Sequence, residues 1–207
     1  ILRENGITKD ILMMSSTTVE RDIELLIQNK IILTVGSKEA GDVIEKIAKK
    51  LDKKIKVHLK IDTGFGRYGF IYNKKEEMVD IIKSWKNIQI DGVFSHFSIA
   101  FYGNGKESKE QFNRYMQCVD TLKNNNINTG MLHICNSSAF LRFTNMYLNA
   151  VRIGSALLGR LSIPNTWGFK KVGYLKSNVT LHLAQGAVLL GSYNALDYKK
   201  DEYIQRT

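Results

Sequence analysis

The feature of this sequence that most restricts its fold is a regular alternation of short apolar segments with amphipathic segments. Strands are predicted at residues 11–14, 31–35, 56–62, 90–97, 131–136 and 150–157. Helices are predicted from residue 17, from residue 37, around residues 74–85 and around residues 108–123. Such an alternation favours a mainly parallel sheet with helices outside it. The fold class is therefore α/β, either a (β/α) barrel or an open doubly wound sheet.

Short-range signals mark several element boundaries. Gly6 is typical of the residue that closes a helical turn, here at residues 1–7, and Ser37 is a favourable N-cap. Residues 17–20 have the form of a capping box. The inward faces of the first two helices are predicted to carry Val19, Ile23, Leu26, Ile27, Val43, Ile44, Ile47, Ala48 and Leu51.

The segment at residues 56–70, KVHLKIDTGFGRYGF, combines a strand with a glycine-rich loop. One face of the strand is formed by Val57, Leu59 and Ile61 and the other by His58, Lys60 and Asp62. Lys60, Asp62 and Arg67 lie at the strand end, where α/β proteins gather their functional groups. A structural salt-bridge cluster fits the same three residues.

The glycines of this loop also match the spacing of a dinucleotide-binding turn, G-x-G-x-x-G, at Gly64, Gly66 and Gly69. That motif requires a helix that begins at the last glycine. Because no convincing helix follows Gly69, the dinucleotide interpretation is disfavoured.

Composition indicates a globular protein with room for one large domain or one domain and a fragment, since 43% of its 207 residues are hydrophobic. No apolar run approaches the length of about 18 residues that crosses a bilayer, and no signal-peptide pattern is present. We therefore expect a cytoplasmic protein without a membrane partner.

The formal charge of +10 raises the question of nucleic-acid binding. Its lysines are scattered among acidic residues and lack interleaved aromatic residues, so no nucleic-acid partner is expected. Cys118 and Cys135 lack the spacing of metal ligands and are predicted to be buried, reduced thiols; no metal site is expected.

Polar side chains recur at the ends of the later predicted strands. They are His96, then His133, Asn136, Ser137 and Ser138, then Arg152, Gly154 and Ser155. Parallel strands bring such ends to one edge of a sheet, so these residues are expected to converge. Hydroxyls, free backbone N–H groups and arginines suit an anionic ligand with a flat ring. Taken singly, a strand-end histidine is more often structural, and Asn136-Ser137 fits a simple turn.

Four motifs, LKIDTGFGRYGF, GVFSHF, HICNSSAFLRF and VRIGSALLG, closely resemble in order and spacing those of bacterial alanine racemase. This family consists of fold-type III enzymes that use pyridoxal 5'-phosphate (PLP), and the resemblance extends from residue 1 to about residue 195. It implies a PLP-binding (β/α)8 barrel represented by strands three to eight, at residues 1–171. Residues 172–207 are then the start of a C-terminal β-domain, with a hairpin from Thr180.

The resemblance assigns roles to the residues at the strand ends. Arg67 corresponds to the arginine that contacts the phenolic oxygen of PLP, Lys60 to a lysine that is often carbamylated, and His96 to a histidine that faces the ring. Ser137, with the backbone N–H groups of Gly154 and Ser155, resembles the phosphate site. Arg152 resembles the arginine that faces the pyridine nitrogen, with His133 and Asn136 behind it.

The sequence also departs from the family pattern. Ile153 stands where the family usually has proline, and Leu158 where it usually has tyrosine. The Schiff-base lysine precedes the segment that corresponds to residue 1, and the catalytic tyrosine comes from the β-domain of a partner subunit. Neither catalytic residue is expected within this chain.

The resemblance therefore implies a PLP-dependent alanine racemase that acts as a homodimer and supplies D-alanine for peptidoglycan, with this chain inactive alone. A racemase of another amino acid, such as serine, carries the same motifs. A non-catalytic PLP-binding protein or truncated gene product is the main alternative, and a PLP-dependent decarboxylase of the same barrel type is a weaker one.

Overall fold

The computed structural model describes residues 1–173. The chain divides into two compact units, Ile1–Ile153 and Gly154–Thr207. The hairpin expected from Thr180 and most of the predicted β-domain lie outside the described residues, so the boundary between residues 171 and 172 stays a prediction.

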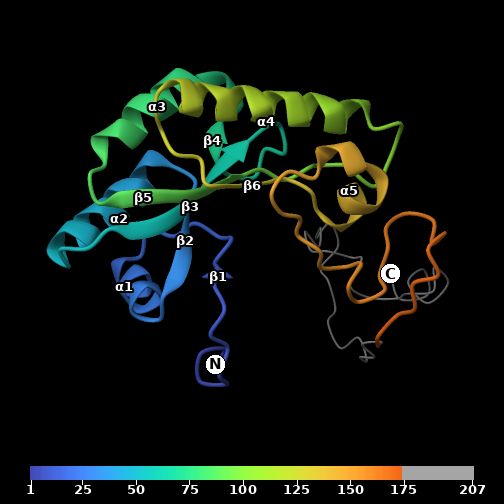
Figure 1. Cartoon of the computed structure of the whole chain (residues 1–207), viewed down its shortest axis with the longest axis horizontal. Coiled ribbons are helices and arrows are strands. Elements are labelled where there is room, and N and C mark those ends of the chain that lie inside the picture. The colour runs from blue at the N-terminus through green and yellow to red at the C-terminus, as the bar shows by residue number, and fades with distance from the viewer. Residues whose placement is uncertain (174–207) are drawn as a thin grey trace, which may run out of the picture. The chain divides into compact units, whose positions relative to one another are not determined.

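The first unit is built on a parallel sheet with the strand order β1-β2-β3-β5-β6 and with β4 paired to the end of β3 (Figure 1). The strands are β1 (Ile11–Leu12), β2 (Ile31–Val35), β3 (Ile55–Asp62), β4 (Phe70–Ile71), β5 (Ile88–Phe94) and β6 (Met131–His133). The helices are α1 (Glu20–Gln28), α2 (Lys38–Lys50), α3 (Lys75–Ser84), α4 (Lys106–Asn124) and α5 (Ser137–Arg142). Single 3-10 turns lie at Tyr72–Lys74 and Thr144–Met146. This curved parallel sheet with external helices is part of a (β/α) barrel, which confirms the predicted fold class.

Strand β3 is the centre of the sheet, and every residue from Val57 to Asp62 is buried. Its apolar side chains pack with Ile44 and Ile47 of α2 and with Trp85 in one hydrophobic core. The polar side chains of its other face are buried as well, which a strand covered on both sides requires. These buried polar groups need hydrogen-bond partners inside the protein.

The local boundary predictions have different outcomes near the N-terminus. Residues 1–7 form a turn in which Ile7 N donates to Leu2 O and Gly6 has a φ of 78°, which confirms the glycine-closed turn. Ser37 caps α2 by accepting from Ala40 N at 3.3 Å. The predicted capping box is wrong, because Thr17 Oγ1 accepts from Val19 N in a local turn. The exposed Val19 occupies the N-cap position of α1 and provides no side-chain cap.

The predicted strand at residues 150–157 is also wrong. Only Ala150 forms a β-bridge, to His133 of β6. Residues 155–160 of the second unit form one helical turn instead, in which Arg160 N donates to Ser155 O and Gly159 N donates to Ala156 O. Gly159 has a φ of 68°, which such a turn ending favours, so local hydrogen bonding replaces strand pairing here.

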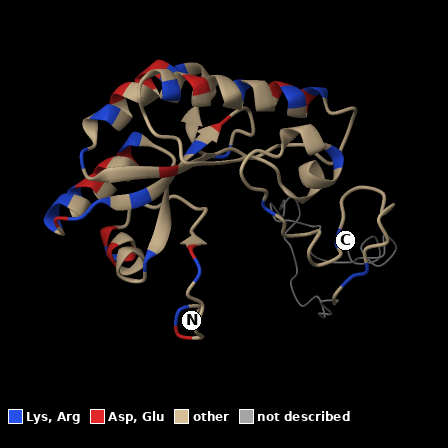
Figure 2. Cartoon of the chain, viewed as in Figure 1, with Lys and Arg blue, Asp and Glu red and all other residues tan. Residues whose placement is uncertain are grey.

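Charged residues of both signs alternate along the helices, as Figure 2 shows. Several form exposed ion pairs, including Lys46 with Glu20 and Lys50 with Glu24 between α1 and α2. Within residues 1–173, no helix has the length and apolar character needed to span a membrane.

Gly41 offers a test of how tightly α2 packs. A Cβ atom on Gly41 would lie 2.0 Å from Cζ2 of Trp85, whose indole N–H donates to Asp42 of the same helix. Gly41→Ala should lower the free energy of unfolding by about 1–3 kcal/mol, because overpacking outweighs a helix-propensity gain of about 1 kcal/mol. Urea unfolding measures this change.

Gly173→Ala is the matched control, since a Cβ atom there meets nothing within 4 Å. It should leave the midpoint of urea unfolding almost unchanged. Stabilisation by Gly41→Ala would show that α2 does not approach Trp85 as described.

Candidate active site

A pocket of about 570 Å³ opens at the carboxyl ends of the central strands. It is lined by Met14, Ser15, Ser16, Lys60, Arg67, Tyr68, Phe94 and His96. The predicted site residues Lys60 and Arg67 of one motif and His96 of another therefore share one pocket. Its volume lies in the range of small-molecule and cofactor sites.

Asp62 shapes the glycine-rich loop beside this pocket. Its Oδ1 accepts hydrogen bonds from the backbone N–H groups of Gly64, Phe65 and Gly66 at 2.9, 2.9 and 3.2 Å. Gly69 then turns back with a φ of 129°, so close to β3 that a Cβ atom would lie 2.9 Å from Lys60 O. The glycines thus allow a tight turn that brings the chain back beside β3. The loop leads directly into strand β4 and not into a helix.

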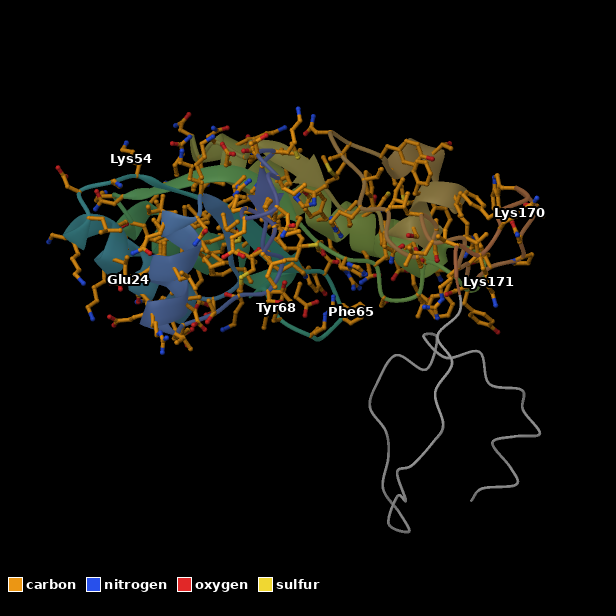
Figure 3. The ribbon with its side chains drawn as sticks, turned by 90° about the horizontal axis from the view of Figure 1, so that it is seen from below. Glu24, Lys54, Phe65, Tyr68, Lys170 and Lys171 are labelled. Atoms are coloured by element: carbon orange, nitrogen blue, oxygen red, sulfur yellow. The ribbon has the colours of Figure 1, made fainter. Side chains whose placement is uncertain are left out.

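The loop presents aromatic and cationic groups to the pocket. The Arg67 guanidinium lies 4.4 Å from the Phe65 ring centroid, and Phe65 meets His96 edge-on at 5.8 Å. Tyr68 donates its hydroxyl hydrogen bond to Met14 O, which ties the loop to the end of β1. Figure 3 labels Phe65 and Tyr68 on this loop.

Lys60 is almost fully buried, with 2% of its surface exposed. Its Nζ donates to Ile61 O at 2.8 Å and to Tyr68 O at 3.3 Å. Burial, with smaller contributions from Arg67 and Arg152, lowers the pKa of Lys60 to about 8 against the opposing effect of Asp62. The amine is therefore neutral more often than an exposed lysine near physiological pH, and the neutral form is the one that reacts with electrophiles.

Arg152 joins the ends of β5 and β6. Its Nη2 donates to Ser95 O at 2.7 Å and to Ile134 O at 3.1 Å, and its Nη1 lies 2.6 Å from His133 Nδ1. Within residues 1–173 it has no carboxylate partner, and its Nε is buried without a hydrogen bond. Burial lowers the pKa of Arg152 to about 10.

His96 stands between Arg152 and Asn136. Arg152 Nη2 lies 3.3 Å from His96 Nδ1, and Asn136 Nδ2 lies 3.4 Å from His96 Nε2. Burial and then the nearby Arg152 lower the pKa of His96 to about 4, so the ring is neutral at physiological pH. Asn136 also caps α5, because its Oδ1 accepts from Ala139 N at 3.0 Å.

His133 lies behind Arg152 and is stacked on Phe94, with ring centroids 5.0 Å apart. Its Nε2 lies 2.9 Å from Nδ1 of His58, a buried residue of β3. Burial lowers the pKa of both histidines, that of His133 to about 3.

The residues of the predicted phosphate site are distributed over both units. Ser137 is buried and begins α5 in the first unit, whereas Gly154 and Ser155 belong to the second unit. Their joint role therefore stays a prediction. Cys118 and Cys135 are buried free thiols, as predicted.

The charges around the pocket are strongly unbalanced. Lys60, Arg67 and Arg152 are close enough for each arginine to lower the pKa of the lysine. Asp62 is the acid that opposes them, and its Oδ1 is occupied by three loop N–H groups. Such a site favours an anionic ligand, and Phe94, Tyr68 and His96 offer it aromatic surface.

Residues 1–162 match the family described as alanine racemase, N-terminal domain. The chain belongs to this family. The sequence resemblance to alanine racemase is thereby confirmed, and the dinucleotide-binding interpretation of the glycine loop is excluded by the β4 strand that follows it.

Relatives of known name agree with this assignment. Alanine racemase of Methanococcus maripaludis is 36% identical over 159 residues, covering 76% of this chain and 42% of the relative. Alanine racemase 1 of Oceanobacillus iheyensis is 30% identical over 196 residues, covering 87% and 50%. The solved alanine racemase of Clostridium difficile in complex with cycloserine is 37% identical with a TM-score of 0.72, covering 76% and 43%. The chain spans about half or less of the length of these relatives.

The sequence patterns assign no functional role to His58, Phe94 or Tyr68, which the structure places at or beside the site. His58 lies on the same strand face as Lys60 and Asp62, so alternation along β3 contains the signal. Phe94 is the last residue of β5, two positions before His96, and Tyr68 follows Arg67 directly. Their roles depend on which strands are neighbours in space, which alternation along one strand does not define.

The lowered pKa values of His96 and His133 predict a pH dependence of stability. Below the ordinary histidine pKa of 6.5, the unfolded chain takes up protons, while the folded chain stays neutral at His96 down to about pH 4 and at His133 down to about pH 3. The free energy of unfolding should therefore fall as pH falls below about 6.5, by about 1.4 kcal/mol per pH unit for each histidine. Urea unfolding at several pH values above about 5 measures this slope, since most carboxylates stay ionised there.

His133→Asn should make the slope shallower, whatever its effect on stability at neutral pH. A slope that is the same in both proteins would contradict a neutral, buried His133.

Proposed function

We propose that this chain forms the PLP-binding part of an amino-acid racemase whose substrate is alanine. The observation that supports this most strongly is a cluster of three cations: Lys60 and Arg67 line one pocket, and Arg152 lies close enough to Lys60 to lower its pKa. Among the described residues, the acid that opposes this effect on Lys60 is Asp62, which holds the glycine-rich loop. Membership of the alanine racemase family supports the assignment of the reaction as racemisation. The Clostridium difficile relative was solved in complex with cycloserine. The predicted homodimer, the cytoplasmic location and the supply of D-alanine for peptidoglycan belong to the same proposal.

The residues present fit PLP. Its phosphate and phenolic oxygen are anionic, which matches the excess of cations at this strand edge. Its flat ring matches the aromatic wall formed by Phe94, Tyr68 and His96. The Nε atom of Arg152 is buried and has no hydrogen-bond partner among the described residues. Since buried donors are normally paired, this N–H group is available to donate to a bound cofactor.

Each side chain then has a defined role. Arg152 would face the pyridine nitrogen as a permanent donor and keep that nitrogen unprotonated, which limits delocalisation into the ring. Arg67 would hold the phenolic oxygen, and His96 would orient the ring as a neutral imidazole. Ser137 and the N–H groups of Gly154 and Ser155 would bind the phosphate. Bound PLP supplies the electron sink that makes the substrate Cα–H bond acidic.

Lys60 would support Arg67 and not carry the cofactor. Its partly neutral amine suits carbamylation by CO2, and the resulting carbamate would replace a buried cation beside Arg67 with an anion. The Schiff-base lysine and the catalytic tyrosine of the family are expected outside this chain, so racemisation requires further residues.

The main alternative is a PLP-binding protein without catalysis. It would use the same pocket and the same arginines. The substrate is a separate question, because racemases of alanine and of serine carry the same motifs around this pocket.

The binding proposal is tested by titrating the 207-residue chain with PLP and following fluorescence or absorbance. PLP should bind reversibly, and Arg67→Met should weaken binding by roughly tenfold, the equivalent of one charge-assisted hydrogen bond. Arg21→Met, at an exposed position of α1, is the matched control and should bind as the unaltered chain does.

Borohydride treatment of the same mixture tests the location of the cofactor lysine. We expect no trapped lysine adduct and no alanine racemisation by this chain alone. A trapped adduct on Lys60, located by peptide mass, would overturn its supporting role. Absence of PLP binding to the folded chain would contradict the proposed function itself.

A further inference from the structure

Half-buried Arg152 and the buried His133 and His58 form a continuous hydrogen-bonded row from the site into the sheet. Arg152 Nη1 lies 2.6 Å from His133 Nδ1, and His133 Nε2 lies 2.9 Å from His58 Nδ1. His58 is 4% exposed and His133 is 2% exposed. His58 does not line the pocket and precedes the first of the four family motifs, so its polar character needs an explanation.

The direction of each hydrogen bond follows from the donors available. A guanidinium group has only N–H donors, so His133 Nδ1 must accept from Arg152. A neutral His133 then carries its proton on Nε2 and donates to His58 Nδ1. His58 in turn must leave Nδ1 unprotonated. A proton added to either ring would place two donors face to face, beside the charge of Arg152.

The sheet is modified locally to hold His58 in this position. Val57 pairs with Ile90 and His58 pairs with Gly92, which leaves Asp91 as an extra residue, a β-bulge in β5. A Cβ atom on Gly92 would lie 2.4 Å from the His58 ring. The bulge and the glycine therefore make the space that the imidazole occupies.

The other contacts of Arg152 define what this row controls. Carbonyl oxygens of Ser95 and Ile134 hold Nη2, and only His133 holds Nη1 among the described residues. If His133 took its other tautomer, Nη1 would face an N–H group and the guanidinium would have to turn. The tautomer of His133 therefore determines which way the arginine donors point.

We propose that His58 is a positioning residue, whose Nδ1 holds His133 in the Nε2–H tautomer and thereby orients Arg152 toward the cofactor. The link to the cofactor rests on the proposed function, whereas the tautomer itself does not. Depressed histidine pKa values agree with neutral rings at both positions.

Nitrogen-15 NMR of the histidine-labelled 207-residue chain, without cofactor, tests the first part. The His133 signals, assigned by their loss in His133→Asn, should show protonated Nε2 and unprotonated Nδ1 at neutral pH. His58→Asn should preserve this pattern, because its amide oxygen replaces Nδ1 as acceptor. His58→Leu, of similar volume but without an acceptor, should give a mixture of tautomers.

Protonated Nδ1 in the unaltered chain overturns the proposal without any variant, even where His58→Leu fails to fold. An unchanged tautomer in a folded His58→Leu protein overturns it as well.

PLP titration of the same proteins tests the second part. His58→Leu should bind PLP roughly tenfold more weakly, and His58→Asn should bind within about threefold of the unaltered chain. Equal binding by the leucine variant overturns the link to the cofactor. If the unaltered chain binds no PLP, the proposed function fails, and the NMR result still decides the role of His58.

Discussion

The structure depends on the half-buried guanidinium of Arg152, which has no acidic partner within residues 1–173. Arg152 draws together the ends of β5 and β6 through Ser95 O, Ile134 O and His133. A buried arginine in a protein is normally paired, because desolvation of a lone charge is costly. Here neutral acceptors replace the carboxylate, which leaves positive charge at the strand ends and favours an anionic ligand there.

This constraint accounts for the buried polar face of β3. His58, Lys60 and Asp62 occupy alternate positions of one strand. His58 orients His133, Lys60 contributes one of the clustered cations, and Asp62 holds the glycine-rich loop. The apolar face of the same strand packs in the hydrophobic core. Stability and site geometry are therefore carried by opposite faces of one strand.

Much of this arrangement was predictable from the sequence, because alternation and strand-end chemistry are local. The parallel sheet, the external helices and the shared pocket of Lys60, Arg67 and His96 followed from such patterns. The row from Arg152 to His58 did not, because it joins residues that are 75 and 19 positions apart along the chain. It also needs the bulge at Asp91, which the periodicity of the apolar residues does not predict.

Two local predictions were wrong for a related reason. In place of the predicted capping box at residues 17–20, Thr17 Oγ1 accepts a hydrogen bond from Val19 N in a local turn. In place of the predicted strand, residues 155–160 form a helical turn that ends at Gly159. In both cases side-chain or backbone groups found closer hydrogen-bond partners than the predicted element offered. Threonine occurs both in capping boxes and in local turns, and glycine occurs both at strand ends and at the ends of helical turns. The residue types alone therefore do not distinguish these structures.

We propose that Arg152 presents a permanent hydrogen-bond donor to the pyridine nitrogen of PLP. Nitrogen-15 NMR of PLP labelled at that nitrogen, bound to the 207-residue chain at neutral pH, tests it most directly. We predict the chemical shift of an unprotonated pyridine. A bound cofactor with the shift of a protonated pyridinium would contradict the claim.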